Sequence, residues 1–458
     1  MSQTPRTNRA ARAARRPLDI TFVLAIAVPL LVALALFLTN PGFGSAYFHQ
    51  PTTHPPERSV VVCPGSFGRG DQLAVGTAGS GPASAAGRSV DLPTDGVALV
   101  RTGSDPVVIT ATGGAAPGLV ATRSSTSPVA ASACVTPRAD QWFTGVGAGP
   151  THRSYVVLVN PNPGPAVADL TVLGDTGPID VPGLRGIAVA GNDSQVIDLA
   201  AVMPTQSGLA VHAVVERGQV AVSVRDRAAH LVGDGYDEDW LPSGGAPSRD
   251  ALLLGLPSGS GSRQLTVANP TDHEVTATVR LVSADSVFTP DNAPTLDIGP
   301  QSVSRVDLAH VLGSAKSKGV VGVEVSASGA VTASLRSLVG GDLSLIAPSS
   351  SISASTTVAV PRGAKELVVG GAGAVGAVTV VSRDATGKEL ASKRVAISPQ
   401  QGLTVPLPGG AVRVDVTAER TSVRGSVLVH GAHGAAVVPL RATRLTGRVP
   451  FVKPGLPR

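Results

Sequence analysis

An internal repeat constrains the fold of this 458-residue chain more strongly than any other feature of its sequence. The segment YVVLVNPNPGPAVADLTVL, which begins at Tyr155, aligns with QLTVANPTDHEVTATVRLV, which begins at Gln264. Both segments contain an Asn-Pro pair, and both are followed at the same distance by an Asp-Leu pair after a β-branched residue. Self-similarity at a fixed period predicts tandem copies of one structural module.

Two further copies flank this pair. ISPQQGLTVPL from Ile397 resembles IGPQSVSRVDL from Ile298 and belongs to a copy that begins near Val358. A diverged copy comes first, with Ser89-Val90-Asp91-Leu92 ahead of two apolar runs. All copies consist of short runs rich in Val, Ala, Thr and Leu, interrupted by Gly, Pro, Asp and Asn. This pattern predicts an all-β fold of tandem Ig-like antiparallel β-sandwich modules, each of roughly 80–100 residues.

Shifts in composition set the expected boundaries of the modules and of the segments around them. In chain order, we expect an Arg-rich cytoplasmic tail (1–19), a transmembrane helix (20–38), a Pro-rich spacer (39–58), a diverged module with a disulfide (59–141), three further modules (142–240, 241–346 and 356–445) and a C-terminal tail (446–458).

The longest apolar stretch, residues 20–38, contains no charged residue. As a helix it would extend about 28 Å, enough for the hydrocarbon core of a bilayer. The alternative is a cleaved secretory signal, whose apolar region is usually only about 7–15 residues long, with Gly44-Ser45-Ala46 as the cleavage site. Both interpretations export the bulk of the chain. We expect an uncleaved single-pass anchor in the cell membrane.

The residues ahead of this stretch are strongly basic and include Arg6, Arg9, Arg12, Arg15 and Arg16. Because Lys and Arg remain on the cytoplasmic side, the N-terminus should be cytoplasmic and the bulk of the chain extracytoplasmic. These five arginines equal the formal net charge of +5. The exported part is therefore neutral overall, which argues against a nucleic acid partner.

The two cysteines, Cys63 and Cys134, both lie on the exported side. In an oxidising compartment such a pair predicts a disulfide. Two free thiols and half of a metal site remain the alternatives.

The repeated residues have a structural interpretation. Asn160-Pro161 and Asn269-Pro270 should end strands, because proline cannot donate to a ladder and an Asn side chain can close a turn. Trp142 and Trp240 each precede a copy by a similar distance and are interpreted as core residues or plugs between modules. A catalytic site seldom recurs in every unit of an array, so repetition favours a structural role.

One glycine-rich motif suggests a nucleotide cofactor. Residues 371–376, GAGAVG, match the dinucleotide-binding pattern G-x-G-x-x-G. That site needs a helix after the glycines, whereas the following AVTVVSRDATGKEL predicts a strand and a turn. We therefore expect no cofactor.

Two polar clusters suggest a metal ion. Asp234, Asp237, Glu238 and Asp239 supply hard oxygen ligands for calcium, although their spacing is not that of an EF-hand and a solvated loop is the simpler interpretation. His430 and His433 have no third ligand nearby in sequence, so a surface turn is favoured over a metal site.

The layout resembles a family of uncharacterised membrane-anchored, exported actinobacterial proteins with tandem β-sandwich repeats. The matching features are the Arg-rich start, the single anchor, the Val-Cys-Pro-Gly element (Val62 to Gly65), the Trp-led repeats and the Asn-Pro strand ends. The fourth module departs from the pattern because it lacks both the Trp and the Asn-Pro pair. The resemblance implies a cell-envelope setting and carries no established activity.

We therefore expect a non-enzymatic scaffold or binding protein of the cell envelope, built as a rod of modules. Its partner would be an envelope or membrane protein that contacts loops and strand edges. Cell-wall polysaccharide is the alternative ligand, although the exported part has few aromatic residues on which sugars could stack. An envelope hydrolase is less favoured, because the chain contains no G-x-S-x-G, H-E-x-x-H or S-x-x-K motif.

Overall fold

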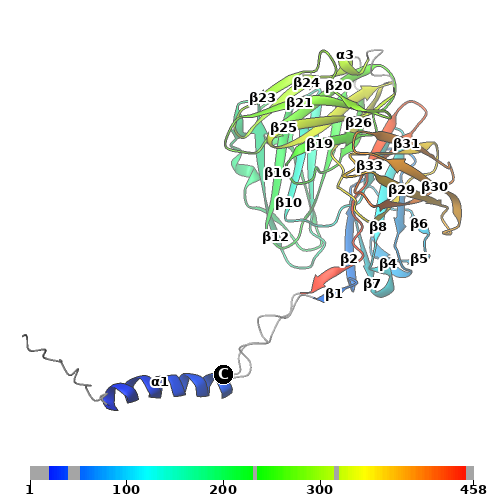
Figure 1. Ribbon diagram of the computed structural model, residues 1–458. Helices are drawn as coiled ribbons and strands as arrows, with labels where there is room; N and C mark the ends of the chain where they lie inside the picture. Colours follow the sequence, from blue (N-terminus) through cyan, green and yellow to red (C-terminus); the bar gives the residue numbers. More distant parts are fainter. Residues whose placement is uncertain (1–19, 40–51, 231–234, 314–318, 450–458) are drawn as a thin grey trace, which may run out of the picture. The chain divides into compact units, whose positions relative to one another are not determined.

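The computed structural model describes residues 20–39, 52–230, 235–313 and 319–449 (Figure 1). These residues form mostly antiparallel β-sheets, which confirms the prediction of a β-rich fold. The chain divides into two compact parts. One comprises Met1–His54 with Arg448–Arg458, and the other, here called the main body, comprises Pro55–Gly447.

The first part contains helix α1 (Ile20–Thr39), with Pro29 inside it, and strand β1 (Thr52–His54), which pairs with β35 (Gly447–Val449). Large apolar side chains along α1, from Ile20 to Leu38, are exposed. Among the described residues, no helix satisfies both the length and the apolarity that crossing a bilayer requires. The predicted topology signal, Arg6 to Arg16, lies outside the described residues, as does most of the expected Pro-rich spacer.

Within the main body, the described residues form four modules, each with a core between two sheets. In module 1, one sheet has the strand order β2 (Arg58–Cys63), β7 (Val107–Thr112), β4 (Gly81–Ala85), β5 (Arg88–Leu92). The second sheet has the strand order β6 (Val97–Val100), β3 (Gln72–Gly76), β8 (Val120–Thr126), β9 (Val129–Ala133).

Module 2 has the same two-layer arrangement. One sheet has the strand order β10 (Asp140–Gly147), β16 (Ser207–Arg217), β12 (Ala166–Gly174), β13 (Gly177–Ile179), and β14 (Ile187–Val189) also pairs with β12. The second sheet has the strand order β15 (Ser194–Asp198), β11 (His152–Val159), β17 (Ala221–Ala229), β18 (Tyr236–Leu241). A short helix, α2 (Leu199–Val202), follows β15.

In module 3 one long strand, β25 (Val320–Val339), belongs to both layers. Its first half pairs with β19 (Ser248–Leu254) and β21 (Val275–Ser283), and β21 also holds β22 (Val287–Phe288) and β23 (Thr295–Ile298). Its second half pairs with β20 (Gly261–Asn269) and β26 (Asp342–Ile346). Strand β24 (Ser302–Asp307) pairs with the other side of β20 and is followed by the short helix α3 (Ala309–Leu312).

Module 4 again contains two four-stranded sheets. The first has the strand order β27 (Ser355–Ala359), β32 (Arg413–Glu419), β29 (Gly376–Arg383), β30 (Glu389–Ile397). The second has the strand order β31 (Gly402–Leu407), β28 (Lys365–Gly370), β33 (Arg424–His430), β34 (Ala435–Pro439).

Alternating burial along the strands explains how the sequence builds these layers. In β11 the side chains of Val156 and Leu158 are buried in the module core, whereas those of Arg153 and Tyr155 are on the opposite face and are only partly buried. Successive side chains of a strand point to opposite faces, so alternation of this kind places the aliphatic residues between the sheets.

The last strands of the four modules lie together in the main body. Strand β9 contacts β18 and β34, and β26 contacts the same two strands. Modules 1 and 4, the first and last in sequence, also touch through β8 and β27. The modules therefore close into a ring. The expectation of an extended rod is wrong, because these contacts join the two ends of the repeat array.

Candidate functional site

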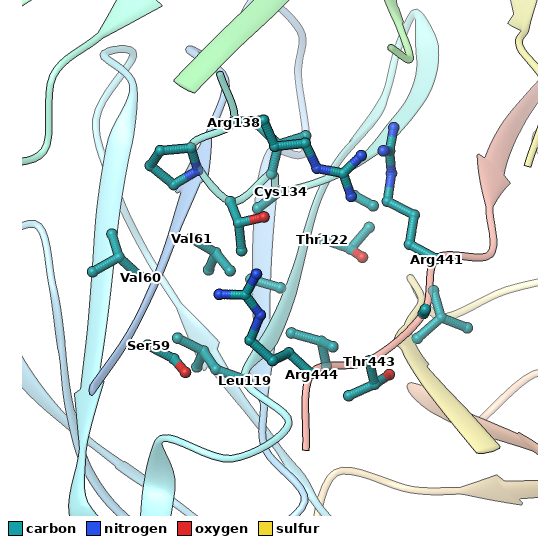
Figure 2. Close-up of a pocket in the computed structure, with 18 of the residues that line it drawn as sticks. Ser59, Val60, Val61, Leu119, Thr122, Cys134, Arg138, Arg441, Thr443 and Arg444 are labelled. Atoms are coloured by element: carbon teal, nitrogen blue, oxygen red, sulfur yellow. The ribbon is translucent and has the colours of Figure 1, made fainter. Parts of the chain in front are cut away.

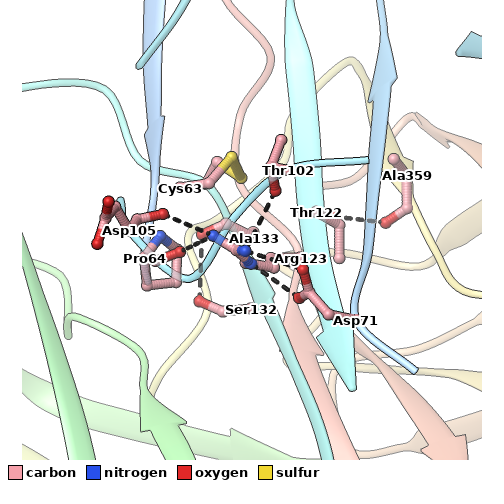
Figure 3. Close-up of a disulfide and its surroundings, with 11 residues drawn as sticks. Cys63, Pro64, Asp71, Thr102, Asp105, Thr122, Arg123, Ser132, Ala133 and Ala359 are labelled. Carbon is pink, nitrogen blue, oxygen red and sulfur yellow. Dashed lines mark hydrogen bonds and ion pairs between the residues drawn. A yellow bond between two sulfur atoms is a disulfide. The ribbon is translucent and has the colours of Figure 1, made fainter. Parts of the chain in front are cut away.

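The predicted disulfide is present and joins Cys63 to Cys134 (Figure 3). Beside it lies Arg123, a fully buried guanidinium on β8 that sequence reasoning did not single out. Its Nε and Nη2 atoms donate to the two carboxylate oxygens of Asp71, each at 2.8 Å, and Nη1 donates to the carbonyl of Pro64 at 2.7 Å. The arginine thus holds the Val-Cys-Pro-Gly element in place.

Both tryptophans lie at junctions between modules. The indole Nε1 of Trp240 donates to the carbonyl of Gly65 at 3.2 Å, and its ring contacts that of Phe67. Trp142 stacks on His212, with ring centroids 4.1 Å apart, and belongs to a small cluster with Ala268 of module 3. Neither ring is available to a sugar, since both are at least nine-tenths buried.

The two repeated asparagines make matching hydrogen bonds. The Nδ2 group of Asn160 donates to the carbonyls of Gly164, Val189 and Ala190, and its Oδ1 accepts from the backbone N–H of Asn162. Asn269 makes the corresponding bonds to His273, Ile298, Gly299 and Thr271. Each side chain is completely buried and closes the loop after its strand, where Pro161 or Pro270 follows.

The acidic residues of the loop considered as a calcium alternative each have a separate partner. Asp237 pairs with His230 at 3.1 Å, and Glu238 pairs with Arg227 at 2.8 Å. Asp239 is buried and accepts from the backbone N–H of Leu345 in module 3. Asp234 lies outside the described residues. No group of three His, Cys, Asp or Glu side chains placed for a metal occurs among the residues that the structure describes.

The other candidate motifs also lie apart from one another. Residues 371–375 form the loop between β28 and β29, and the strand β29 begins at Gly376, where a dinucleotide site would require a helix. His430 pairs with Glu366 at 3.5 Å at the end of β33.

A buried polar cluster joins modules 2 and 3. His152 Nε2 and Ser154 Oγ both lie within hydrogen-bonding distance of Asp226 Oδ2, at 2.8 and 2.6 Å, and Arg336 Nε of module 3 donates to Asp226 Oδ1. The three residue types are those of a hydrolase triad. In that arrangement, however, the serine hydroxyl pairs with the histidine, whereas Ser154 donates to the carboxylate.

A pocket of about 370 Å³ opens where modules 1, 2 and 4 meet (Figure 2). Four arginines line it, of which Figure 2 labels three that point into the same space. Arg58 comes from β2, Arg138 from the segment between modules 1 and 2, and Arg441 and Arg444 from the segment after β34. The residues that the structure assigns to the lining include no Asp or Glu.

Burial and mutual repulsion lower the pKa of two of these arginines, Arg138 and Arg441. Burial, together with the charge of Arg138, lowers the pKa of Arg441 to about 10. Burial and the charge of Arg444 likewise lower the pKa of Arg138. Arg441 donates through Nη2 to Ser243, but its Nε is buried and finds no acceptor in the described part of the chain. A bound anion would relieve both effects, because it would neutralise the repulsion and supply acceptors.

The segment that carries Arg441 and Arg444 is held on both sides. Thr443 Oγ1 accepts from the backbone N–H of Thr357 in β27 at 2.8 Å. The carbonyl of Arg444 accepts from the backbone N–H of Gly118 in module 1 at 2.9 Å. The segment is therefore held in the pocket wall by a side-chain contact to module 4 and a backbone contact to module 1.

Residues 96–408 match the signature of a family of unknown function, DUF5719. The chain belongs to this family. The matched segment begins just before β6 of module 1 and ends just after β31 of module 4, so it contains Arg138 but not Arg58, Arg441 or Arg444. Three of the four arginines that line the pocket thus lie outside the residues that match the family.

No curated protein matches the chain. Among solved structures, the α-L-rhamnosidase of Streptomyces avermitilis complexed with L-rhamnose is matched with 10% sequence identity and a TM-score of 0.11. The match covers 81% of this chain and 57% of the enzyme's chain. A score this low supports no inference about fold or activity.

Proposed function

We propose that this DUF5719 protein is a membrane-anchored, extracytoplasmic binding protein of the cell envelope, and that the arginine pocket is its ligand site. The observation that carries the proposal is the convergence of four arginines on a pocket whose described lining has no carboxylate. Arg441 is partly buried without a carboxylate, which costs stability. Arg58, Arg138 and Arg444, in contrast, are exposed to solvent and free to contact a ligand. A planar guanidinium is suited to carboxylate or phosphate. The expected ligand is therefore anionic.

The anchor is proposed from the sequence. Residues 20–38 are uncharged throughout, and α1 spans Ile20–Thr39. The side chain of Phe22, inside this stretch, lies outside the described residues. The large apolar side chains exposed along α1 would be costly in water and favourable in lipid. The tandem modules are proposed to be Ig-like sandwiches, on the basis of their paired antiparallel sheets.

Cell-wall polysaccharide is less well supported as the ligand. The pocket lining of the described residues has no Phe, Tyr, Trp or His, and sugars are usually held by stacking on aromatic rings. Aliphatic and hydroxyl groups, such as Leu119 and Thr443, occupy the wall between the arginines (Figure 2).

The site is tested by crosslinking in intact cells that express the full chain, followed by mass spectrometry. Three forms are compared: the wild type, the double variant R138Q/R441Q, and R185Q as a matched control. Arg185 is an exposed arginine of module 2 that pairs with the exposed Asp180. We expect the wild type and R185Q to recover the same partner, and R138Q/R441Q to lose it. Equal recovery by all three would show that the ligand binds elsewhere.

The anchor is tested separately by fractionation. Full-length protein should sediment with membranes and be digested by protease added to cells stripped of their outer layers. Replacing Leu30, Leu31 and Leu34 with Asp should release it, since a charged residue at the centre of a spanning helix costs roughly 3 kcal/mol. Cytosolic wild-type protein would contradict the proposal.

A further inference from the structure

We propose that the ligand of the arginine pocket is an extended, acidic segment of another polypeptide, which adds as a strand to the free edge of β2. This inference rests on the proposed function, since it specifies what the anionic ligand is. It comes from the backbone hydrogen bonds around the pocket together with the charge of its wall.

Strand β2 is the edge strand of its sheet and pairs on one side with β7. On its outer side, Val62 exchanges both backbone hydrogen bonds with Val135, at 2.8 and 2.9 Å. In an antiparallel ladder, alternate residues direct their N–H and C=O groups to the same side. The backbone groups of Val60 therefore point outward as those of Val62 do.

The outward groups of Val60 have no protein partner among the described residues, and Val60 lines the pocket (Figure 2). The pairing begun by Val135 stops at the pocket, since Pro137, the next residue in register with Val60, has no N–H to donate, and an extended peptide is proposed to take the strand position beside Val60. An extended peptide in that position would continue the sheet and satisfy the N–H and C=O of Val60, as in other cases of strand addition.

The strand edge on the opposite side of the pocket is already occupied. In β27, the backbone N–H of Thr357 donates to Thr443 Oγ1, and the carbonyl of Ala359 accepts from Thr122 Oγ1 at 2.6 Å. Side chains of modules 1 and 4 thus block the edge of β27. The described pocket wall therefore offers the edge of β2 and not that of β27.

The wall chemistry sets the sequence of the added strand. Side chains alternate between the two faces of a strand, so one face of the peptide can carry acidic groups toward Arg138, Arg441 and Arg444. The absence of aromatic side chains from the described lining disfavours a stacked sugar or base. We therefore expect Asp or Glu at every second position, with small or β-branched residues between them.

The test places a photo-crosslinking amino acid at Gln219, which lies on the pocket rim, in the full chain in intact cells. The adduct is then sequenced by mass spectrometry. Two variant pairs are compared. V60P removes the outward N–H, and V60A keeps it; proline is tolerated on edge strands. R441Q removes a pocket charge, and R185Q removes an exposed one.

We expect a polypeptide adduct with alternating acidic residues. Its yield should fall about tenfold in V60P relative to V60A, in line with one lost hydrogen bond, and also in R441Q relative to R185Q. Circular dichroism and urea unfolding establish that V60P and R441Q are folded.

The two proposals fail in different ways. If R441Q loses the adduct while V60P and V60A behave alike, or if the adduct is a glycan or a lipid, the anion site stands and strand addition is wrong. If R441Q and R185Q give the same adduct, or if no adduct forms, the pocket is not the ligand site and both proposals are wrong.

Discussion

Arg336 Nε of module 3 donates to Asp226 Oδ1 of module 2 across 3.2 Å, and both side chains are almost inaccessible to solvent. The carboxylate also accepts from Ser154 and lies 2.8 Å from His152 Nε2. Burial alone would raise the pKa of Asp226, but the charge and hydrogen bond of His152, together with Arg336 and Ser154, bring it below its ordinary value. The junction between the two modules therefore contains an ionised group that depends on its partners.

The variant D226A should destabilise the protein strongly. It leaves Arg336 buried without its carboxylate, and breaking a buried pair from one side costs about 3–5 kcal/mol. The measurement is the free energy of unfolding in urea. The control is D180A, which removes an exposed pair with Arg185 and should change that free energy by less than about 1 kcal/mol. Equal effects of the two variants would show that the junction is not held by this carboxylate.

Stability should fall as pH rises from about 4 to 7 because of Asp342. Burial, reinforced by the negative charge of Asp237, raises the pKa of Asp342 to about 7, and its Oδ2 atom is buried with no partner in the described part of the chain. A carboxyl whose folded pKa is raised contributes its full stability below the unfolded pKa and loses that contribution as pH rises through the folded pKa. Asp239, which burial shifts in the same direction, adds to the trend.

The pH dependence is measured as the unfolding midpoint between pH 4 and 8. D342N keeps an uncharged side chain of the same size, so its profile should be flatter over this window, by at most about 4 kcal/mol. Asp226 has a lowered pKa and loses stability only as pH falls below about 4, outside this window. Parallel profiles for wild type and D342N would exclude Asp342 as the titrating group.

The variants N160A and N269A should lower stability by similar amounts. Each removes a buried amide that serves three carbonyls and one backbone N–H. Buried polar groups left unpaired cost about 1–3 kcal/mol each, so we expect a total loss of roughly 3 kcal/mol per variant, measured by urea unfolding. The control is N162A, whose side chain makes an exposed bond to Gln219. A large difference between N160A and N269A would show that the two loops are not energetically equivalent.

Local patterns in the sequence were sufficient to predict the β-rich fold and the disulfide. Short β-branched runs alternate between faces, and a chain with only two cysteines has one possible intramolecular pairing. The Asn-Pro pairs indicated turns because an Asn side chain and a proline act within a few residues of themselves.

The arginine pocket could not be predicted in this way. Arg138 and Arg441 are far apart in sequence, and they meet only because modules 1 and 4 close the ring. No spacing rule connects them, and each is an ordinary isolated arginine in its own segment. Arg123 was missed for the same reason, since its partners Asp71 and Pro64 come from separate loops of module 1. Ring closure is a tertiary property that the repeat pattern does not encode.

The ligand-free protein should become more stable when Arg441 is replaced by methionine. Burial and the nearby charge of Arg138 lower the pKa of Arg441, and its Nε lacks an acceptor in the described structure. An apolar side chain of similar length removes this cost, and we expect the free energy of unfolding to rise by about 1 kcal/mol despite the lost bonds to Ser243.

The same substitution should abolish partner recovery, because an anionic ligand would lose one of the guanidinium groups that we propose it contacts. A structural arginine behaves differently. Arg123 is fully buried but is paired with Asp71, so R123M should lower the free energy of unfolding by about 3 kcal/mol or more. Urea unfolding of R441M and R123M side by side separates the two roles. If R441M is destabilised as much as R123M, Arg441 holds the modules together and its charge is not kept for a ligand.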